Sequence, residues 1–469
     1  MKGRKVGISG KRKSFAGIWS AWRTLPHATK AWYILLVLFV VQACVVATIT
    51  KFGVPPDETN HIHFINYYTD HSISPILTDQ TPTYNLGDKT REVDYLYHYS
   101  MSLIRRALPF NLETELHIIR LFSVAFAVLT FMTLRRVARR LGVSEWAAVV
   151  ALAIASGLSM VLLMSAVVNN DVLVWLGVAL GMLLLVRLAE KPRLVDLLWL
   201  MALVAYGGIC KRTLLPISLV FALVGMALAA RRWRSLFIEA RRPSKAVIIA
   251  GIFVLIGVGL SAERIGGNVL RYGHANPTCA EVQGEEACYN FWANIREREM
   301  AAQPKKPLIS TPEFVGRWFQ ESFINILDIQ TQGWRHEVKP PVWLEPLLLM
   351  FVLAGTGYGL IRELRFWSRD THARVRLMVL GLSVFYILFH LLVNYGEYRH
   401  YRVFGLALNG RYILAGLLPL LFLLIWYWSM LLERTPRWLR IGLALVFIAV
   451  LVWGSGLHLL LQNPQLVHG

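Results

Sequence analysis

The chain has 469 residues, of which 55% are hydrophobic and only 17% are charged, and its mean hydropathy is +0.48. A chain of this composition must contain long apolar stretches, which indicates a polytopic membrane protein. The formal charge of +20 would suit a nucleic-acid-binding protein, but anchoring to anionic lipid explains it, so we expect no nucleic-acid partner.

Eleven apolar runs are long enough to cross a bilayer. The strands of membrane β-barrels alternate polar and apolar residues, whereas these runs are continuous. We therefore predict an all-α fold with about 11 transmembrane helices, of which the fourth and fifth are the least well defined. The predicted spans are 32–51, 118–135, 146–165, 171–188, 194–210, 213–230, 246–262, 343–361, 376–394, 411–430 and 440–460.

The basic residues predict the orientation of these spans, because cytoplasmic segments carry an excess of Lys and Arg near helix ends. With the N-terminus in the cytoplasm, the inner segments hold 29 of the 49 basic residues and 7 of the 29 acidic residues. The first span has no small-residue cleavage site and is expected to remain as an anchor. An odd number of spans then places the C-terminus outside, together with two long loops, 52–117 and 263–342.

The first outer loop begins with PPDETNH. Two prolines end the first span, and Asp57 suits the N-cap of a new helix whose residues Ile62, Ile65 and Tyr68 share one face. A second amphipathic stretch at 91–106 carries Asp94, Tyr97 and His98. We therefore predict amphipathic juxtamembrane helices in this loop. Taken alone, Asp57 and Glu58 are equally compatible with a cap and a first-turn partner of the helix dipole.

Polar residues recur at the other predicted outer helix ends. Asn169, Asn170 and Asp171 lie between the third and fourth spans, and Arg411 and Tyr412 open the tenth. Basic side chains at such ends often only extend toward the membrane–water interface and have no further role. Lys211 and Arg212, however, lie between the fifth and sixth spans, on the side where basic residues are disfavoured, which indicates a functional role.

Two of the four cysteines lie together in the second outer loop. Cys279 and Cys288 are nine positions apart in CAEVQGEEAC, which predicts a local disulfide in an oxidising compartment. The alternatives are two free thiols or an incomplete metal site. The chain has no G-x-G-x-x-G or Walker sequence, so no nucleotide site of those kinds is expected.

Taken in order, PPDETNH, RLFSVAFAVLT at 120–130, the NND turn, KRTLLP and NGRYI resemble the GT-C superfamily. These integral membrane glycosyltransferases include protein O-mannosyltransferases and the aminoarabinose transferase of lipid A. The closest likeness is to a bacterial membrane protein family with a P-D-E-x-x-H first loop and a late G-R-Y. The resemblance covers about residues 30–420. It departs from the family in one place, where YLYHYS replaces a proline-rich segment and leaves the role of His98 open.

The resemblance implies a periplasmic active site in the bacterial inner membrane. A sugar would pass from a polyprenyl-phosphate-linked donor to a glycan, lipid or protein acceptor, with inversion. Asp57 would be the catalytic base and Glu58 the second acid. Lys211, Arg212 and Arg411 are the cations available to the phosphate. The remaining candidates for binding donor or substrate are His61, His98, Asn170, Asp171 and Tyr412.

A metal requirement is left open, because Asp57, Glu58 and Asp171 can either bind Mg²⁺ or Mn²⁺ or act without one. For Arg411, the alternative to phosphate binding is an ion pair with an outer-loop acid that holds the tenth helix in place.

The expected organisation is a basic cytoplasmic N-terminus (1–31), a transmembrane catalytic module (32–262), an outer loop (263–342) and C-terminal transmembrane helices (343–469). The rival functions are a polysaccharide polymerase or ligase and a lipid-linked sugar transporter or flippase. Transporters place ionisable groups near the membrane midplane, whereas the charges here gather at outer helix ends, which favours chemistry.

Overall fold

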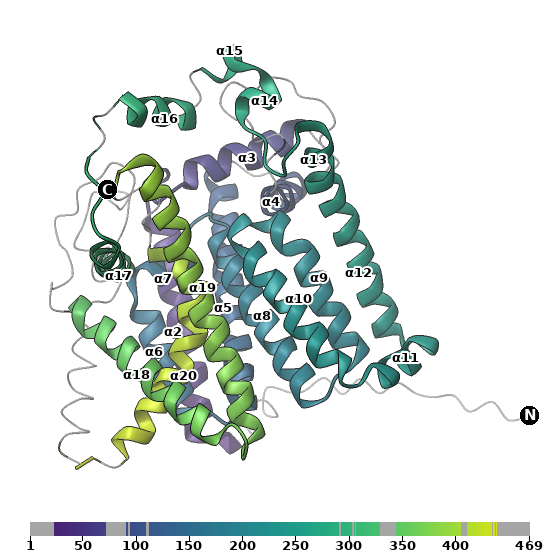
Figure 1. The fold of residues 1–469 in the computed structure, drawn as a ribbon, viewed down its shortest axis with the longest axis vertical. Helices are drawn as coiled ribbons and strands as arrows, with labels where there is room; N and C mark the ends of the chain where they lie inside the picture. Colours follow the sequence, from purple (N-terminus) through teal and green to yellow (C-terminus); the bar gives the residue numbers. More distant parts are fainter. Residues whose placement is uncertain are drawn as a thin grey trace, which may run out of the picture.

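A computed structural model describes residues 23–71, 91, 94–108, 112–289, 292–302, 304, 306–328, 344–404, 410–433, 435–436 and 438. Over these residues the fold is helical, without a β-strand. Eight helical segments in this part of the chain are long and apolar enough to span a membrane, which confirms the all-α polytopic membrane fold (Figure 1). Their helices are α2 (His27–Ile49), α5 (Leu112–Arg140), α8 (Asp171–Glu190), α10 (Leu215–Ala230), α12 (Lys245–Ser261), α18 (Leu344–Phe366), α19 (Thr371–Tyr401) and α20 (Leu414–Leu432).

Short turns extend three of these helices. The 3-10 turns η2 (Arg212–Leu214) and η4 (Gly410–Ile413) precede α10 and α20. The π-helical turn η3 (Ala262–Gly266) joins α12 to α13 (Gly267–Tyr272). The two 3-10 turns contain the predicted site residues Arg212, Arg411 and Tyr412, which therefore lie where these helices begin.

Two predicted spans differ from simple long helices. The third is broken into α6 (Glu145–Gly157) and α7 (Ser159–Ser165), which are bent by 78° at an extended Leu158. The fifth is α9 (Leu194–Cys210), a shorter apolar helix of 17 residues. Every residue of α7 is buried, so protein surrounds the broken backbone, as the bilayer interior requires. The predicted eleventh span (440–460) and most of the predicted N-terminal segment (1–31) lie outside the described residues.

The first predicted outer loop contains the two expected amphipathic helices, α3 (Glu58–His71) and α4 (Leu96–Ala107). On α3, Ile62, Ile65 and Tyr68 are buried, which confirms the predicted apolar face. Figure 1 shows α3, α4 and α13 at one end of the bundle and the basic helix α11 (Trp233–Arg241) at the other. Segments predicted to lie on one side of the membrane therefore do lie at one end of the molecule.

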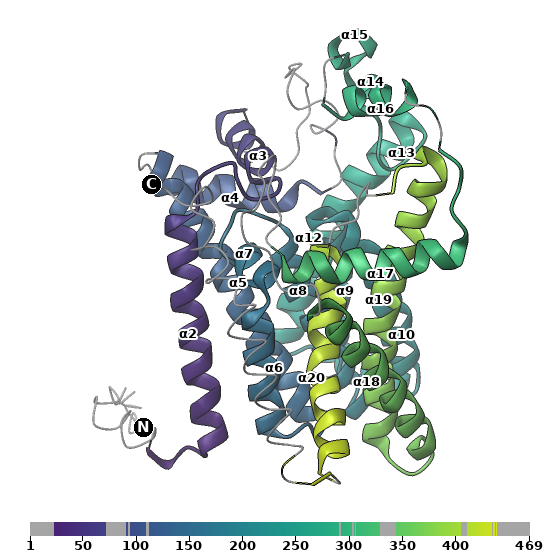
Figure 2. The same cartoon turned by 90° about the vertical axis from the view of Figure 1, so that its left-hand side faces the viewer.

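A further amphipathic helix, α17 (Thr311–Leu327), runs across the long helices (Figure 2). Its buried face includes Phe314, Trp318 and Ser322. It packs so closely on η4 that a Cβ atom at Gly410 would lie 2.3 Å from the Ser322 carbonyl oxygen. Gly410 therefore permits the close approach of η4 to α17, and this contact holds the start of the tenth predicted span against α17.

A buried ion pair fastens α3 to the bundle. Glu58 is 0% exposed and accepts two bonds from Arg120 of α5, at 2.9 Å and 2.7 Å. The same carboxylate accepts the backbone N–H of Val168 at 3.0 Å. Arg120 also donates to the carbonyls of Ala47 and Thr50, at 2.8 Å and 2.9 Å. These contacts connect α3 with the end of α2, with α5 and with the link between α7 and α8.

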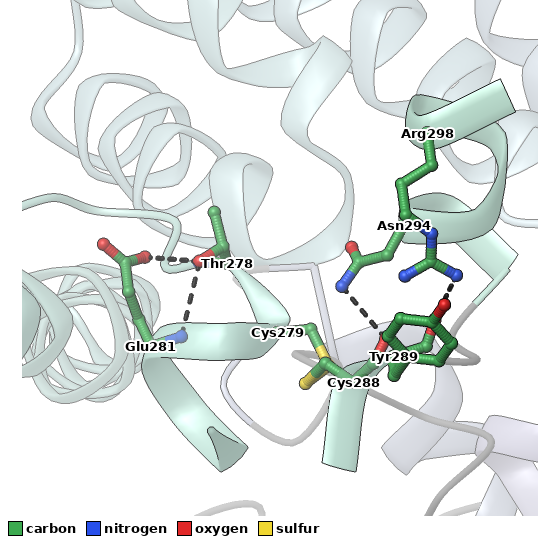
Figure 3. Close-up of a disulfide and its surroundings, with 7 residues drawn as sticks. All are labelled: Thr278, Cys279, Glu281, Cys288, Tyr289, Asn294 and Arg298. Atoms are coloured by element: carbon green, nitrogen blue, oxygen red, sulfur yellow. Dashed lines mark hydrogen bonds between the residues drawn. A yellow bond between two sulfur atoms is a disulfide. The ribbon is translucent and has the colours of Figure 1, made fainter. Parts of the chain in front are cut away.

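The two loop cysteines form the predicted disulfide. Cys279 begins α14 (Cys279–Gln283), Cys288 ends α15 (Glu285–Cys288), and their Cα atoms are 5.8 Å apart (Figure 3). Thr278 and Glu281 close a capping box at the start of α14. The side chain of Asn294, on α16 (Trp292–Ala302), donates to the Cys288 carbonyl at 3.1 Å. The disulfide therefore closes a small unit that rests on local contacts.

Replacing both loop cysteines, as Cys279→Ser/Cys288→Ser, is expected to destabilise that local unit by about 2–3 kcal/mol. Without the cross-link, the unfolded state of the loop regains conformational entropy. Limited proteolysis should cut the variant near α14 and α15 while the melting temperature of the bundle stays unchanged. Cys44→Ser, at a free cysteine, is the control. Alkylation of Cys279 and Cys288 themselves in the non-reduced native protein, located by mass spectrometry and distinguished from the free Cys44 and Cys210, would contradict the disulfide.

Arg120→Ala should cost about 3–5 kcal/mol of unfolding free energy, because it leaves the buried Glu58 carboxylate without its cation. Thermal unfolding in detergent micelles measures this loss. The matched control is Arg317→Ala on α17, whose pair with Glu313 is half exposed and should contribute less than about 1 kcal/mol. Equal melting temperatures for the two variants would show that the buried pair does not hold α3.

Candidate active site

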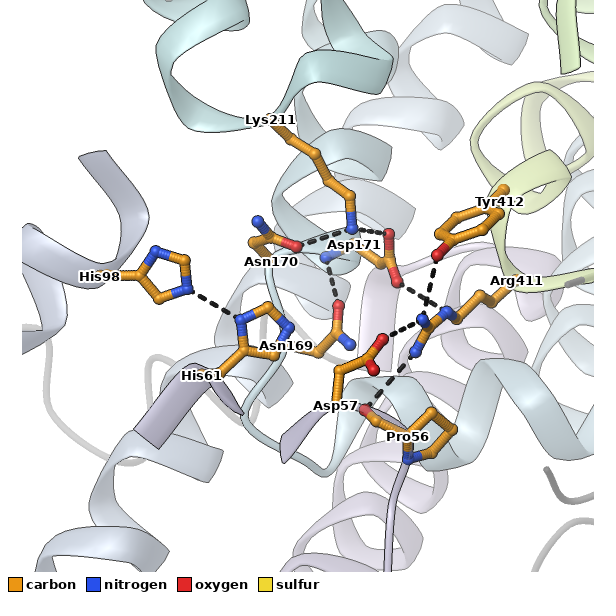
Figure 4. A network of polar contacts seen from close by, with 10 residues as sticks. All are labelled: Pro56, Asp57, His61, His98, Asn169, Asn170, Asp171, Lys211, Arg411 and Tyr412. Atoms are coloured by element: carbon orange, nitrogen blue, oxygen red, sulfur yellow. Dashed lines mark hydrogen bonds and ion pairs between the residues drawn. The ribbon is translucent and has the colours of Figure 1, made fainter. Parts of the chain in front are cut away.

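The turn before α3 separates its two acids. Asp57 has a φ of 61°, in the left-handed region that non-glycine residues seldom adopt. This conformation costs roughly 1 kcal/mol and is often found at functional sites. Glu58, the next residue, faces Arg120 inside the bundle, whereas Asp57 faces Arg411 (Figure 4). The two carboxylates that are adjacent in sequence thus belong to different ion pairs.

Arg411, on η4, lies between two carboxylates. Its Nη2 atom donates to Asp57 Oδ2, and its Nε atom is 3.4 Å from Asp171 Oδ2. It also donates to the Pro56 carbonyl at 3.5 Å and to the Tyr412 hydroxyl at 3.1 Å. Only 4% of its side chain is exposed. Arg411 thus makes the ion pair with an outer-loop acid that was the alternative to phosphate binding.

Lys211 forms a second charged contact at the start of α8. Its ammonium donates to Asn170 Oδ1 at 2.7 Å and to Asp171 Oδ1. It also lies over the Tyr412 ring, 5.5 Å from the ring centroid. Asn169 accepts the Asp171 backbone N–H at 2.6 Å, which fixes the turn that carries both acceptors. Asp171 therefore joins Lys211 and Arg411 in one network.

These groups border a cavity of about 250 Å³. Its lining contains seven of the ten predicted site residues. Asp171 and Arg411 lie behind the lining, and Glu58 lies away from it. The lining residues are Asp57, Asn60, His61, Phe64, Asp94, His98, Asn170, Lys211, Arg212, Thr213 and Tyr412.

Four lining residues were not among the predicted site residues: Asn60, Phe64, Thr213 and Asp94, which was noted only as part of the amphipathic stretch 91–106. Helical spacing could have identified Asn60 and Phe64, because a helix that begins after Asp57 places residues three and seven positions further on along one face. Thr213, in η2, comes directly after Lys211 and Arg212, and only this adjacency in the sequence could have suggested it.

The opposite part of the lining holds an acid and two histidines. Arg212 Nε is 3.8 Å from Asp94 Oδ1, and 49% of the Arg212 side chain is exposed. His61 on α3 and His98 on α4 are hydrogen-bonded through Nδ1 and Nε2, at 2.8 Å. Tyr97 packs on both rings, and burial raises the pKa of its hydroxyl far above the usual range, so it remains neutral.

The carboxylates considered for Mg²⁺ or Mn²⁺ do not converge on one point. Within the described part of the chain, no three His, Cys, Asp or Glu residues are grouped so that they could hold a metal ion. Asp57 is paired with Arg411, Glu58 with Arg120, and Asp171 with Lys211. This arrangement offers cations, and not carboxylates alone, to an anionic ligand.

Residues 109–259 match the model of a family described as dolichyl-phosphate-mannose-protein mannosyltransferase. No curated protein and no solved structure matches the chain significantly. The matched segment runs from just before α5 into the last turn of α12 and includes Arg120, Asp171 and Lys211. It lies in the expected membrane module and agrees with the motif order. The match supports a membrane glycosyltransferase of the GT-C superfamily.

Proposed function

We propose that the protein transfers a sugar from a polyprenyl-phosphate-linked donor to a glycan, lipid or protein acceptor at the periplasmic face of the bacterial inner membrane. The observation that carries this proposal is the cavity, whose lining combines a carboxylate, Asp57, with two cations, Lys211 and Arg212. Glycosyl transfer from a lipid phosphate needs both: a proton acceptor for the attacking hydroxyl and positive charge for the leaving phosphate.

Asp57 is the proposed base. The acceptor hydroxyl attacks the anomeric carbon, its proton passes to the Asp57 carboxylate, and the electron pair of the breaking bond leaves with the phosphate oxygen. One displacement inverts the anomeric centre. Arg411 holds Asp57 Oδ2 from behind and so orients the carboxylate, whose side chain is 37% exposed.

Lys211 and Arg212 are the proposed phosphate ligands. The phosphate gains negative charge as the sugar departs, so cations that line the cavity stabilise the leaving group. Arg411 is buried behind the lining, and its geometry supports a positioning role in place of direct phosphate contact. Glu58, buried against Arg120, is proposed to position α3 and not to act as a second catalytic acid.

Asp57→Asn should fold normally but lose transfer by about 10²–10⁴-fold, because an amide keeps the shape and cannot accept the proton. The measurement is sugar release from polyprenyl-phosphate-mannose by purified protein in lipid vesicles. Asp70→Asn, at an exposed position on the same helix, is the control and should remain fully active. Transfer by Asp57→Asn within twofold of the wild type would refute the base assignment.

Lys211→Met should raise the donor KM by about 10–100-fold, the effect of losing one charged hydrogen bond of about 1.5–3 kcal/mol. Arg411→Lys should instead lower kcat with little change in donor KM, because Arg411 acts through Asp57. Initial rates over a range of donor concentrations separate the two effects. Lys191→Met, at the far end of α8, is the control. A change confined to donor KM in Arg411→Lys would assign Arg411 to the phosphate.

A further inference from the structure

The histidine pair in the cavity wall is a chemical group that the proposed displacement does not yet use. His61 and His98 are 9% and 4% exposed, and their rings lie nearly parallel, with centroids 5.1 Å apart. His61 Nδ1 and His98 Nε2 are 2.8 Å apart, and both residues line the same cavity as Asp57. Packing alone does not require two imidazoles to share a hydrogen bond beside a reacting carboxylate.

The contact between the rings fixes how many protons the pair can hold. One nitrogen must donate and the other must accept, so only one proton occupies the position between them. A neutral pair carries one further proton on an outer nitrogen. A singly charged pair carries protons on both outer nitrogens and keeps the shared bond. The pair can therefore take up one proton without breaking its hydrogen bond.

Asp57 is a poor place for the abstracted proton to stay. When its carboxylate becomes neutral, Arg411 loses its closest counter-charge while only 4% of the arginine side chain is exposed. Asp171, the other carboxylate near Arg411, is already shared with Lys211. An arginine cannot release its own proton, so the neutral carboxyl beside it is unfavourable. The proton must move on before the next turnover.

We propose that His61 and His98 form a proton relay that takes the acceptor's proton from Asp57 and carries it out of the cavity. This proposal rests on the transfer reaction proposed above. His61 Nε2 accepts the proton from the Asp57 carboxyl, which becomes a carboxylate again. His61 Nδ1 then passes the shared proton to His98 Nε2, and His98 Nδ1 releases its proton to water. The pair ends neutral, with the shared proton on His98 and the other proton on His61 Nε2. Loss of that proton to water, uptake of one from water at His98 Nδ1 and return of the shared proton to His61 restore the starting tautomer before the next turnover.

The surroundings permit one positive charge on the pair. The groups that face it from α3, α4, the α9–α10 turn and η4 have formal charges that cancel, and Glu58 behind them is neutralised by Arg120. The formal charges of the groups around the imidazoles therefore balance. Imidazole titrates near pH 6.5 in model peptides, a range suited to moving protons in neutral water. The facing groups are Asp57, Asp94, Tyr97, Lys211, Arg212 and Tyr412.

The test uses His61→Asn and His98→Gln in the full-length protein. The Asn and Gln amides can replace the ring nitrogens in the shared bond, Nδ1 of His61 and Nε2 of His98, but they cannot relay a proton. Both variants should keep the wild-type melting temperature and donor KM while kcat falls by about 10²-fold or more. His63→Asn, exposed on the same helix, should remain fully active.

Rescue by added imidazole distinguishes a relay from a packing role. His61→Ala should lose kcat and regain at least about tenfold with imidazole, because the free base can occupy the space and take the proton. Asp57→Asn should gain nothing from imidazole. A wild-type kcat in His61→Asn, or a low kcat in His61→Ala that imidazole does not raise, would overturn the relay. If Asp57→Asn were inactive while the histidine variants were fully active, the relay would be refuted and the proposed transferase would stand. If the wild type released no sugar, the proposed transferase would itself be refuted.

Discussion

The buried pair of Glu58 and Arg120 is the interaction on which the site geometry depends. Burying two charges is expensive, and such a pair is stable only when its remaining hydrogen-bonding positions are filled. Here the Val168 N–H and the carbonyls of Ala47 and Thr50 fill them. The pair fixes where α3 begins, so the preceding turn must bring Asp57 to the opposite side, against Arg411.

Once α3 is fixed, charge neutralisation arranges the rest of the cavity. Asp57 meets Arg411, and Asp171 meets both Arg411 and Lys211, so one carboxylate connects two helix starts. The broken α6–α7 pair makes this possible, because it returns the chain to the polar end of the bundle inside a protein environment. The result is a polar cavity at one end of an apolar bundle, suited to a donor with a charged head and a lipid tail.

The family match and the site overlap only in part. Residues 109–259 supply Arg120, Asn170 and Lys211. The turn before α3, together with η4, lies outside the matched segment and supplies Asp57 and Arg411. Residues from inside and outside the match therefore meet in and directly behind one cavity, so the motifs form one site.

The sequence alone determined the helical membrane fold and seven of the eleven cavity residues, because apolar length is a local property and the polar motifs stand out against apolar runs. It also determined the Cys279–Cys288 pairing, which joins residues close in the chain. Only the tertiary structure decided that Glu58 and Asp57 face different partners and that Arg411 lies behind the cavity. A positive φ at Asp57 and the packing of residues 62 and 354 positions apart in the chain select those ion pairs, and neither can be read from local hydropathy.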